Sequence, residues 1–314
     1  MAKQDSFGWQ QNVVSLNPTL SYSFLTNFDF SQLSDSSQPK QLADKPVLLC
    51  LHGWLDNAAS FTPLAAFFDG YHIIALELAG HGYSSHRPEF SHYHLVDWVY
   101  DLYLLVDKLN LPAFYLLGHS MGGMIASVYT ALKQDKVKKL ILLESSAAFT
   151  SNADALVDNM QAAFESRLQL EKSTPDSDSA NNKNNRKMRS LKSLPGLIQA
   201  RARMSDLTDA LAGLLIERNI ELLADGFIWR SDPRVKTLSP IRLDEAQAKA
   251  YIEAIQVDCL VVLALNGYPS IARAIYNRQT YFKQLEIQRL AGGHHFHMQN
   301  PAELAALIKR FIAD

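Results

Sequence analysis

The stretch FYLLGHSMGG, residues 114–123, decides the fold. It joins an apolar, strand-like run to a Gly-x-Ser-x-Gly motif, and a helical pattern follows over residues 120–132. A sharp strand-to-helix turn needs small residues two positions on either side of its centre, and Gly118 and Gly122 supply them. Such a turn places the Ser120 hydroxyl above a sheet at a helix N-terminus, where the helix dipole favours developing negative charge. The motif predicts a nucleophilic serine, and a simple packing turn is the alternative.

Short apolar runs alternate with longer amphipathic stretches along most of the chain. The runs expected to form strands are residues 46–51, 72–78, 113–117, 139–143, 259–265 and 285–290. The stretches expected to form helices are residues 61–68, 93–109, 120–132, 243–255 and 301–312. Continuous rather than alternating apolarity indicates strands that are buried on both faces, as in a parallel sheet. The alternation therefore predicts a doubly wound α/β fold.

Two regions depart from this alternation. The N-terminal region is typical of two antiparallel strands around a turn at residues 17–18. Residues 146–239 show helical stretches and no convincing strand, and a polar part at 172–185 predicts a mobile loop. We therefore expect an α/β core formed by residues 1–145 and 240–314, with a helical cap inserted at 146–239.

Composition excludes several classes of protein. The 314 residues are 47% hydrophobic and 20% charged, as in an ordinary globular protein. Thirty basic residues against thirty-two acidic ones argue against a nucleic-acid binder that works by bulk charge. Cys50 and Cys259 are too few for a disulfide scaffold, and both lie in apolar runs that predict buried thiols. The longest apolar run, residues 259–265, is far shorter than the roughly 20 residues of a membrane span. We expect a cytoplasmic protein without a membrane span.

Charge is unevenly distributed in one part of the insertion. Residues 183–203 contain seven Lys or Arg and no acidic residue. The favoured interpretation is a solvated helix face, because exposed charge runs are ordinary. The alternative is an electropositive rim that attracts anionic substrates or acidic lipid.

A second motif, LHGWLDN at residues 51–57, directly follows the first buried strand. A His-Gly turn at the carboxyl end of a strand can aim backbone N–H groups into the crevice where ligands bind. The expected oxyanion donors are the backbone N–H groups of Trp54 and Met121. Asp56 and Asn57 are more simply explained as turn or helix-capping residues. The residues expected to support the site are His52, Gly53, Gly118, His119 and Gly122.

The third motif is GGHHFHMQNP, residues 292–301. A general base for a serine must come from a loop at the same sheet edge, and a histidine late in the chain fits the order Ser, acid, His. We choose His294 over His295 because His294 follows the glycine pair and lies seven residues before Pro301. His297 is interpreted as a packed histidine that faces the last helix.

A metal site is the competing hypothesis for the histidines. Its ligands would be His92, His94, His294, His295 and His297. No carboxylate or cysteine completes this set at a recognisable spacing, so we expect neither a metal nor a cofactor.

Through these motifs the chain resembles the α/β-hydrolase superfamily, in particular its cap-bearing, dehalogenase-like branch, and it is most similar to the serine-hydrolase-like proteins. The stretches that carry the resemblance are VLLCLHGWLDNAASF (47–61), LELAGHGYSSH (76–86), LLGHSMGG (116–123), KLILLESSAAF (139–149) and GGHHFHMQNP (292–301). The resemblance implies a mostly parallel eight-stranded sheet, a helical cap after the sixth strand, and hydrolysis by a Ser-His-acid triad.

The triad acid departs from the pattern of this family. Most members place it after the seventh strand, but residues 263–273 contain no Asp or Glu here. Some dehalogenase-like relatives place it just after the sixth strand, where this chain has Glu144. Strands five and six are neighbours in this fold, so we hypothesise that Glu144 orients His294 through its second ring nitrogen. The alternatives are that Glu144 caps a helix of the cap and that Asp56 is the acid.

A serine at the elbow excludes the carboxylate nucleophile of dehalogenases and epoxide hydrolases. The resemblance therefore predicts a serine hydrolase that cleaves acyl, carboxyl-ester-like bonds of a small molecule through a covalent acyl-enzyme. The alternatives are a C–C hydrolase, a thioesterase, a cofactor-free haloperoxidase, or a non-catalytic ligand-binding protein. The insertion is expected to roof the site and select the substrate. Its candidate lining residues are Phe149, Phe164, Phe227 and Trp229.

Overall fold

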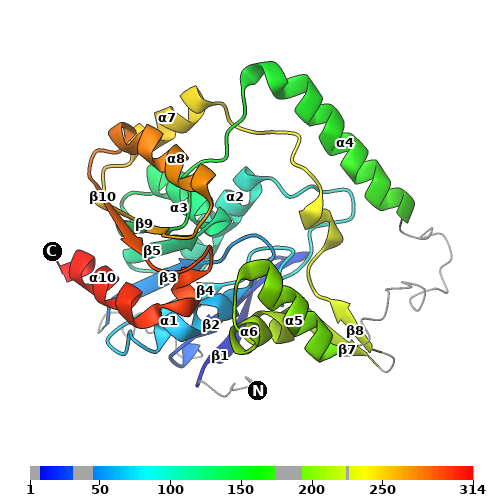
Figure 1. Ribbon diagram of the computed structural model, residues 1–314, viewed down its shortest axis with the longest axis horizontal. Helices are drawn as coiled ribbons and strands as arrows, with labels where there is room; N and C mark the ends of the chain where they lie inside the picture. Colours follow the sequence, from blue (N-terminus) through cyan, green and yellow to red (C-terminus); the bar gives the residue numbers. More distant parts are fainter. Residues whose placement is uncertain (1–7, 31–44, 174–192, 224–225, 314) are drawn as a thin grey trace.

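The computed structural model describes residues 8–30, 45–173, 193–223 and 226–313. A sheet of eight strands crosses the molecule, with helices on both faces (Figure 1). In chain order the strands of this sheet are β1 (Gln10–Asn17), β2 (Leu20–Thr26), β3 (Val47–Leu51), β4 (His72–Leu76), β5 (Phe114–His119), β6 (Val137–Leu143), β9 (Cys259–Ala264) and β10 (Leu285–Leu290). Across the sheet they lie in the order β1-β2-β4-β3-β5-β6-β9-β10.

The directions of the strands confirm the predicted arrangement. β1 and β2 form an antiparallel hairpin, and β2 pairs antiparallel with β4. All the other pairings of this sheet are parallel. The carboxyl ends of β3, β5, β6, β9 and β10 therefore meet along one edge, where the three sequence motifs follow their strands.

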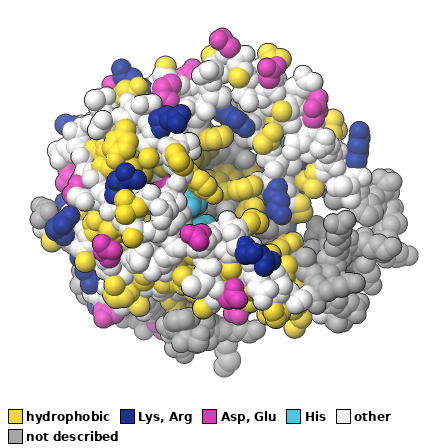
Figure 2. All heavy atoms as spheres, viewed as in Figure 1, with side chains coloured by type: hydrophobic (Ala, Val, Ile, Leu, Met, Phe, Trp, Pro, Cys, Tyr) yellow, Lys and Arg dark blue, Asp and Glu magenta, His cyan; other side chains and the backbone are white. Residues whose placement is uncertain are grey.

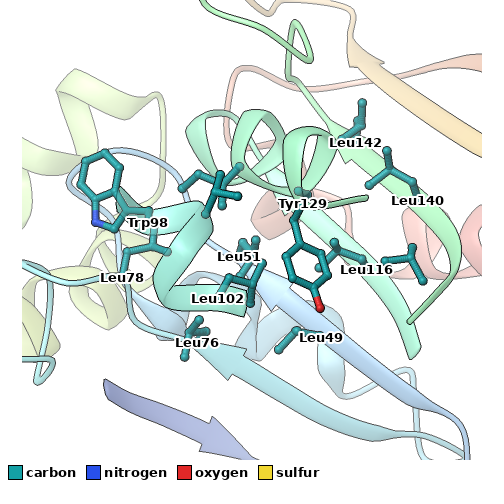
Figure 3. Close-up of a cluster of buried hydrophobic side chains, with 14 of the residues drawn as sticks. Leu49, Leu51, Leu76, Leu78, Trp98, Leu102, Leu116, Tyr129, Leu140 and Leu142 are labelled. Carbon is teal, nitrogen blue, oxygen red and sulfur yellow. The ribbon is translucent and has the colours of Figure 1, made fainter. Parts of the chain in front are cut away.

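Both faces of the sheet are buried, because alternate residues of each central strand enter different cores. In β3, Leu49 and Leu51 point into one core, whereas Leu48 and Cys50 point into the other. The first core packs beneath α2 (Leu95–Lys108), α3 (Met121–Leu132), α7 (Glu245–Ala254) and α8 (Pro269–Arg278). Figure 3 shows part of it, with leucines of four strands packed around Tyr129 and Leu102. The second core packs against η3 (Ala58–Phe61), α1 (Thr62–Ala65), α9 (Phe296–Gln299) and α10 (Pro301–Ala313).

The insertion after β6 is helical with one exception. Its elements are η4 (Ala153–Ala155), α4 (Leu156–Ser173), α5 (Leu194–Ser205), α6 (Asp209–Asn219), β7 (Ile220–Leu223), β8 (Gly226–Trp229) and η5 (Pro233–Lys236). The expectation of a strand-free insertion is wrong at β7 and β8, which pair antiparallel. Each strand has only four residues, too few to show a period in the sequence. In Figure 1, α4 projects beyond the body of the molecule, while α5 and α6 pack on each other. We call residues 146–239 the cap segment.

The structure also tests the predictions of a polar loop, of buried cysteines and of an absent membrane span. The predicted loop at 172–185 is wrong at its first two residues, which are the last turn of α4, and its remainder lies outside the described residues. Helix α8 and the short η6 (Gln279–Tyr281) were not predicted. Cys50 and Cys259 are free and buried as expected, and burial raises the pKa of the Cys259 thiol to about 12. No helix within the described parts of the chain is long and apolar enough to cross a membrane.

Candidate active site

The structure places Ser120 at the turn between β5 and α3. Its backbone has a φ of 51° and a ψ of −118°, and its N–H donates to the Leu143 carbonyl of β6 at 2.9 Å. The turn tolerates no flanking side chains. A Cβ on Gly118 would lie 2.5 Å from the Gly122 carbonyl oxygen, and one on Gly122 would lie 2.2 Å from the Leu51 carbonyl oxygen. Ser120 is half-buried and lies at the carboxyl edge of the sheet, beside the end of β3.

The predicted oxyanion donors lie at the ends of two paired strands. Trp54 follows β3, and Met121 is the first residue of α3 after β5. Among the hydrogen bonds formed by the described residues, none uses the backbone N–H of Trp54 or of Met121. The Trp54 indole N–H donates to the Val235 carbonyl at 3.0 Å. Two backbone donors therefore remain available at this edge of the sheet.

His52 and Gly53 fix the start of the loop that carries Trp54. His52 is fully buried, and its Nε2 accepts a hydrogen bond from the Leu78 N–H at 3.0 Å. Its Nδ1 therefore carries the proton and donates to the Gly53 carbonyl at 2.7 Å. Burial lowers the pKa of His52 to about 4, which keeps the ring neutral. A Cβ on Gly53 would lie 2.9 Å from the Nδ1 of His119.

His119, the residue before the serine, connects the elbow to the histidine loop. Its Nε2 lies 2.9 Å from the backbone carbonyl oxygen of His294. Because a carbonyl only accepts, this nitrogen donates. The two rings lie 4.8 Å apart between centroids, and burial lowers the pKa of His119. The contact ties residue 294 to the same edge of the sheet as Ser120.

His294 is half-buried and packs against Tyr268, with ring centroids 4.5 Å apart. Burial, reinforced by the neighbouring His119 and His295, lowers the pKa of His294 to about 2. The ring is therefore neutral at pH 7, the state that a general base requires. Its Nδ1 is buried and has no hydrogen-bond partner among the described residues.

The other two histidines of the loop have different surroundings. His295 is buried, and its Nε2 lies 3.2 Å from the Asp56 carboxylate. His297 is completely buried, with its ring 4.2 Å from that of His119 and 5.6 Å from that of Phe61. His297 is therefore a packed histidine, as predicted. The rings that it contacts belong to His119 of the elbow and Phe61 of η3.

Glu144 directly follows β6 and is almost fully buried, with a φ of 43°. Its carboxylate accepts the Ala264 N–H at 2.7 Å and the Tyr268 N–H at 2.8 Å. Burial raises the pKa of Glu144, and the two N–H groups act against this shift. The structure thus holds Glu144 against the loop after β9, where most members of the resembled family carry their acid. No hydrogen bond within the described residues joins Glu144 to His294, although both contact Tyr268.

Asp56 forms a charged cluster that the sequence did not predict. Its buried carboxylate contacts the Arg201 guanidinium of α5, the His295 Nε2, and the His119 Nδ1 at 3.6 Å. Burial raises the pKa of Asp56, but these three partners outweigh it and hold the pKa well below its usual range. The interpretation as turn or helix-capping residues is correct for Asn57, whose side chain accepts the Ala59 N–H at the start of η3. It is incomplete for Asp56, whose N–H closes a turn but whose carboxylate forms this cluster.

The same cluster is where a cation would bind most readily. Among the described residues, Asp56, His119 and His295 form the group whose ligand atoms lie close enough to share a metal ion. This set differs from the histidine set considered from the sequence. His94 instead bonds to Ser239 and stacks on His92. In the cluster, Arg201 contacts Asp56 and lies 3.4 Å from the His295 Nε2, so a positive charge already occupies this position.

Arg201 also corrects the interpretation of the basic stretch. The expectation of a solvated helix face is wrong for Arg201, which is mostly buried in an ion pair. It is correct for Arg203, which is exposed. The other five basic residues of the stretch lie outside the described residues. Nothing in the local sequence distinguishes Arg201 from its neighbours, because its partner is 145 positions away.

One face of the molecule is hollowed. Figure 2 shows a depression near the centre of this face, bordered largely by hydrophobic side chains, with histidine at its base. Of the expected lining residues, Phe149 and Phe164 are exposed, and Phe227 and Trp229 are half-buried. A separate cavity of about 290 Å³ contains none of the predicted catalytic residues. It is lined by Gln199, Ala202, Arg203, Asp206, Leu207 and Asp209.

Known proteins that are similar to this chain over most of its length include two curated relatives and one crystal structure. A serine hydrolase-like protein of Danio rerio is 26% identical over 280 residues, which cover 85% of this chain and 81% of the relative. Serine hydrolase-like protein 2 of Homo sapiens is 28% identical over 284 residues, with 85% and 87% covered. A crystal structure of a hypothetical protein of Pseudomonas aeruginosa matches with a TM-score of 0.79 at 28% identity, over 97% of this chain and 99% of that one.

The matches confirm the resemblance seen in the motifs and support hydrolase activity. The alpha/beta hydrolase fold family matches residues 46–212, just over half of the chain. The chain therefore belongs to the α/β hydrolase family.

Proposed function

We propose that the protein is a serine hydrolase that cleaves ester-like acyl bonds of small molecules through a covalent acyl-enzyme on Ser120. The observation that carries this proposal is the conformation of the elbow. Ser120 occupies a strained backbone region at the sheet edge where Trp54 and Met121 have unused N–H groups. Strain of this kind persists where the surroundings enforce it, and it clusters at functional sites.

The proposed mechanism assigns a role to each group. Ser120 attacks the carbonyl carbon while His294 accepts its proton, and the Trp54 and Met121 N–H groups hold the oxyanion. His294 then gives the proton to the leaving group, and water hydrolyses the acyl-enzyme by the same steps. The position of His294 supports its role, because its backbone carbonyl is bound by His119, the residue that precedes Ser120. His295 is less suited to this role, since its Nε2 faces the Asp56 carboxylate.

Glu144 is proposed as the acid that orients His294. Its position supports the proposal, because it lies at the end of β6 and contacts the same Tyr268 that packs against His294. The unpartnered His294 Nδ1 is the atom that such an acid would hold. Asp56 is the weaker candidate, because its charge is shared with Arg201, His119 and His295.

The substrate class follows from the surroundings of the site. The hydrophobic border of the hollow favours an apolar acyl or alcohol group (Figure 2). A C–C hydrolase would need free polar groups for a dienol or diketone. Arg201, a cation that lies beside His295 of the histidine loop, is instead paired with Asp56. Thioesters share the acyl chemistry of esters, so a substrate panel must separate these two.

The experiment is hydrolysis of p-nitrophenyl esters of increasing chain length by the wild type and by Ser120→Ala, His294→Ala and Glu144→Gln. We expect wild-type turnover, and we expect each variant to lose about three or more orders of magnitude in kcat while remaining folded. Ser270→Ala, which changes an exposed serine near the start of α8, is the matched control. Equal turnover by Ser120→Ala would refute the proposal. Full turnover by Glu144→Gln would refute only the role proposed for Glu144, not the role of Ser120.

A further inference from the structure

The loop that carries Trp54 is fastened to the cap segment at four consecutive residues. We call residues 53–57 the oxyanion loop. Each residue from 54 to 57 makes one polar contact with a different residue of the cap segment. The contacts are Trp54 Nε1 to the Val235 carbonyl (3.0 Å), Asn219 Nδ2 to the Leu55 carbonyl (3.2 Å), Arg201 to the Asp56 carboxylate, and Asn57 Nδ2 to the Leu215 carbonyl (2.9 Å).

Asp56 is the point where this loop meets the rest of the site. Its N–H closes a turn onto the Gly53 carbonyl at 3.2 Å. Its carboxylate meets His119 of the elbow and His295 of the histidine loop. With Arg201 from α5, one buried carboxylate therefore joins the oxyanion loop, the elbow residue before Ser120, the histidine loop and the cap segment.

The oxyanion loop needs such support because it holds a strained residue. Leu55 has a φ of 59°, in the left-handed region that leucine seldom adopts. A side chain in that region persists only where its surroundings over-determine it. Relaxation of Leu55 would turn the peptide groups on either side of it and displace the preceding residue, so the Trp54 N–H would lose its aim.

We propose that Arg201 is a positioning residue whose ion pair with Asp56 holds the oxyanion loop in shape, so that the cap segment helps to build the oxyanion hole. This inference rests on the proposed function. The Arg201 side chain is 14% exposed and that of Asp56 is 2% exposed, so water screens the pair poorly. Removing either partner leaves a charge buried alone. An oxyanion donor acts in the transition state, so its displacement lowers kcat more than it raises KM.

The test compares Arg201→Met with Arg203→Met, the exposed arginine two positions further along α5. Arg201→Met should lower kcat for a p-nitrophenyl ester by about 10- to 100-fold and leave KM within about threefold. The Ki of a trifluoromethyl ketone, whose hemiketal oxyanion occupies the hole, should rise by the same factor as kcat/KM falls. Arg203→Met should match the wild type, and Arg201→Lys should recover part of the lost kcat because it restores the charge.

A double variant separates positioning from folding. Arg201→Met with Asp56→Asn removes both charges, so neither remains buried alone. It should unfold at a denaturant concentration close to that of the wild type and still show the low kcat and the weak trifluoromethyl ketone binding. Wild-type kcat in the folded Arg201→Met or in the double variant would overturn the inference, as would a change confined to KM. An inactive wild type would instead refute the proposed function, and this inference with it.

Discussion

Ser120 has a backbone conformation that favours glycine, because a Cβ crowds the neighbouring peptide at a φ of 51° and a ψ of −118°. Positions of this kind cost about 1–3 kcal/mol each, and they persist where the fold enforces them. Here β5 and α3 enforce the turn, and the Ser120 N–H is anchored to β6. The proposed nucleophile is therefore held in place at some cost to stability.

Replacing Ser120 with glycine should relieve this strain. We expect Ser120→Gly to be more stable than Ser120→Ala by about 1 kcal/mol, after the greater flexibility of glycine in the unfolded chain is counted. Both variants should be inactive. Urea unfolding at pH 7.5 measures the difference, and a Ser120→Gly variant that unfolds earlier than Ser120→Ala would contradict the strained-turn account.

At the residue scale, what could be predicted depended on how local the interaction is. The elbow is encoded within Gly118 to Gly122, so its motif specified the turn that the structure shows. Asp56 was interpreted as a turn or helix-capping residue, and its charged partners were missed because they are distant in sequence: Arg201 lies 145 positions away and His295 lies 239 away. No periodicity connects residues that far apart.

At the scale of elements, the first turn of α3 packs against two strands so closely that no side chain fits between them. Gly122 approaches the Leu51 carbonyl of β3, and Gly118 of β5 approaches the backbone of Gly122 and Gly123. This close packing brings the end of β3, with the oxyanion loop, next to the nucleophile. The short distance between α3 and the strands β3 and β5 therefore helps to form the site.

A substitution of Gly122 tests this packing, and a substitution of Gly213, in an uncrowded helix, serves as its contrast. Gly122→Ala should destabilise the protein by about 3 kcal/mol or more, because its Cβ would lie 2.2 Å from a backbone oxygen. Gly213→Ala in α6 should stabilise it by about 0.5–1 kcal/mol, because the nearest atom to its Cβ is 3.8 Å away and alanine favours a helix. Thermal and urea unfolding report both effects. A mild effect of Gly122→Ala would mean that the helix and the strand can move apart.

The elements that could be predicted are those with a long and uniform pattern. The runs of β3 and β9 are apolar throughout and fully buried, as strands covered on both faces must be, whereas β10 carries polar residues and is half-buried. Strands β7 and β8 have four residues each, and their hairpin is held by pairing rather than by any repeat. Helix α8 shows few buried positions, and one of them is Arg278, so hydrophobicity did not reveal it.

At the scale of the whole molecule, several neutral histidines lie buried or half-buried along the carboxyl edge of the sheet. Burial lowers the pKa of His52 to about 4 and that of His81 to about 3, and burial with neighbouring histidines lowers that of His294 to about 2. In the unfolded chain these groups return to a pKa of about 6.5. Below that pH the unfolded state binds more protons than the folded state, so acid must favour unfolding.

The free energy of unfolding should therefore be greatest above pH 6.5 and fall as the pH drops toward 4. Each such histidine contributes up to about 1.4 kcal/mol per pH unit in this window. Urea unfolding at pH 7.5, 6.5 and 5.5 measures the slope. His81→Gln removes one titrating group outside the proposed machinery and should make the slope shallower by about that amount. Equal slopes for the variant and the wild type would show that His81 is not buried in its neutral form.

Mass spectrometry of the labelled protein tests whether Ser120 is the nucleophile that forms the acyl-enzyme. The folded wild type is treated with a fluorophosphonate, digested with trypsin, and compared with Ser120→Ala. The account predicts a single adduct on the peptide of residues 109–133, located at Ser120 and absent from the variant. Labelling should be much slower in His294→Ala, because the base that activates the serine is missing. A folded wild type without an adduct, or with its adduct on another residue, would contradict the account.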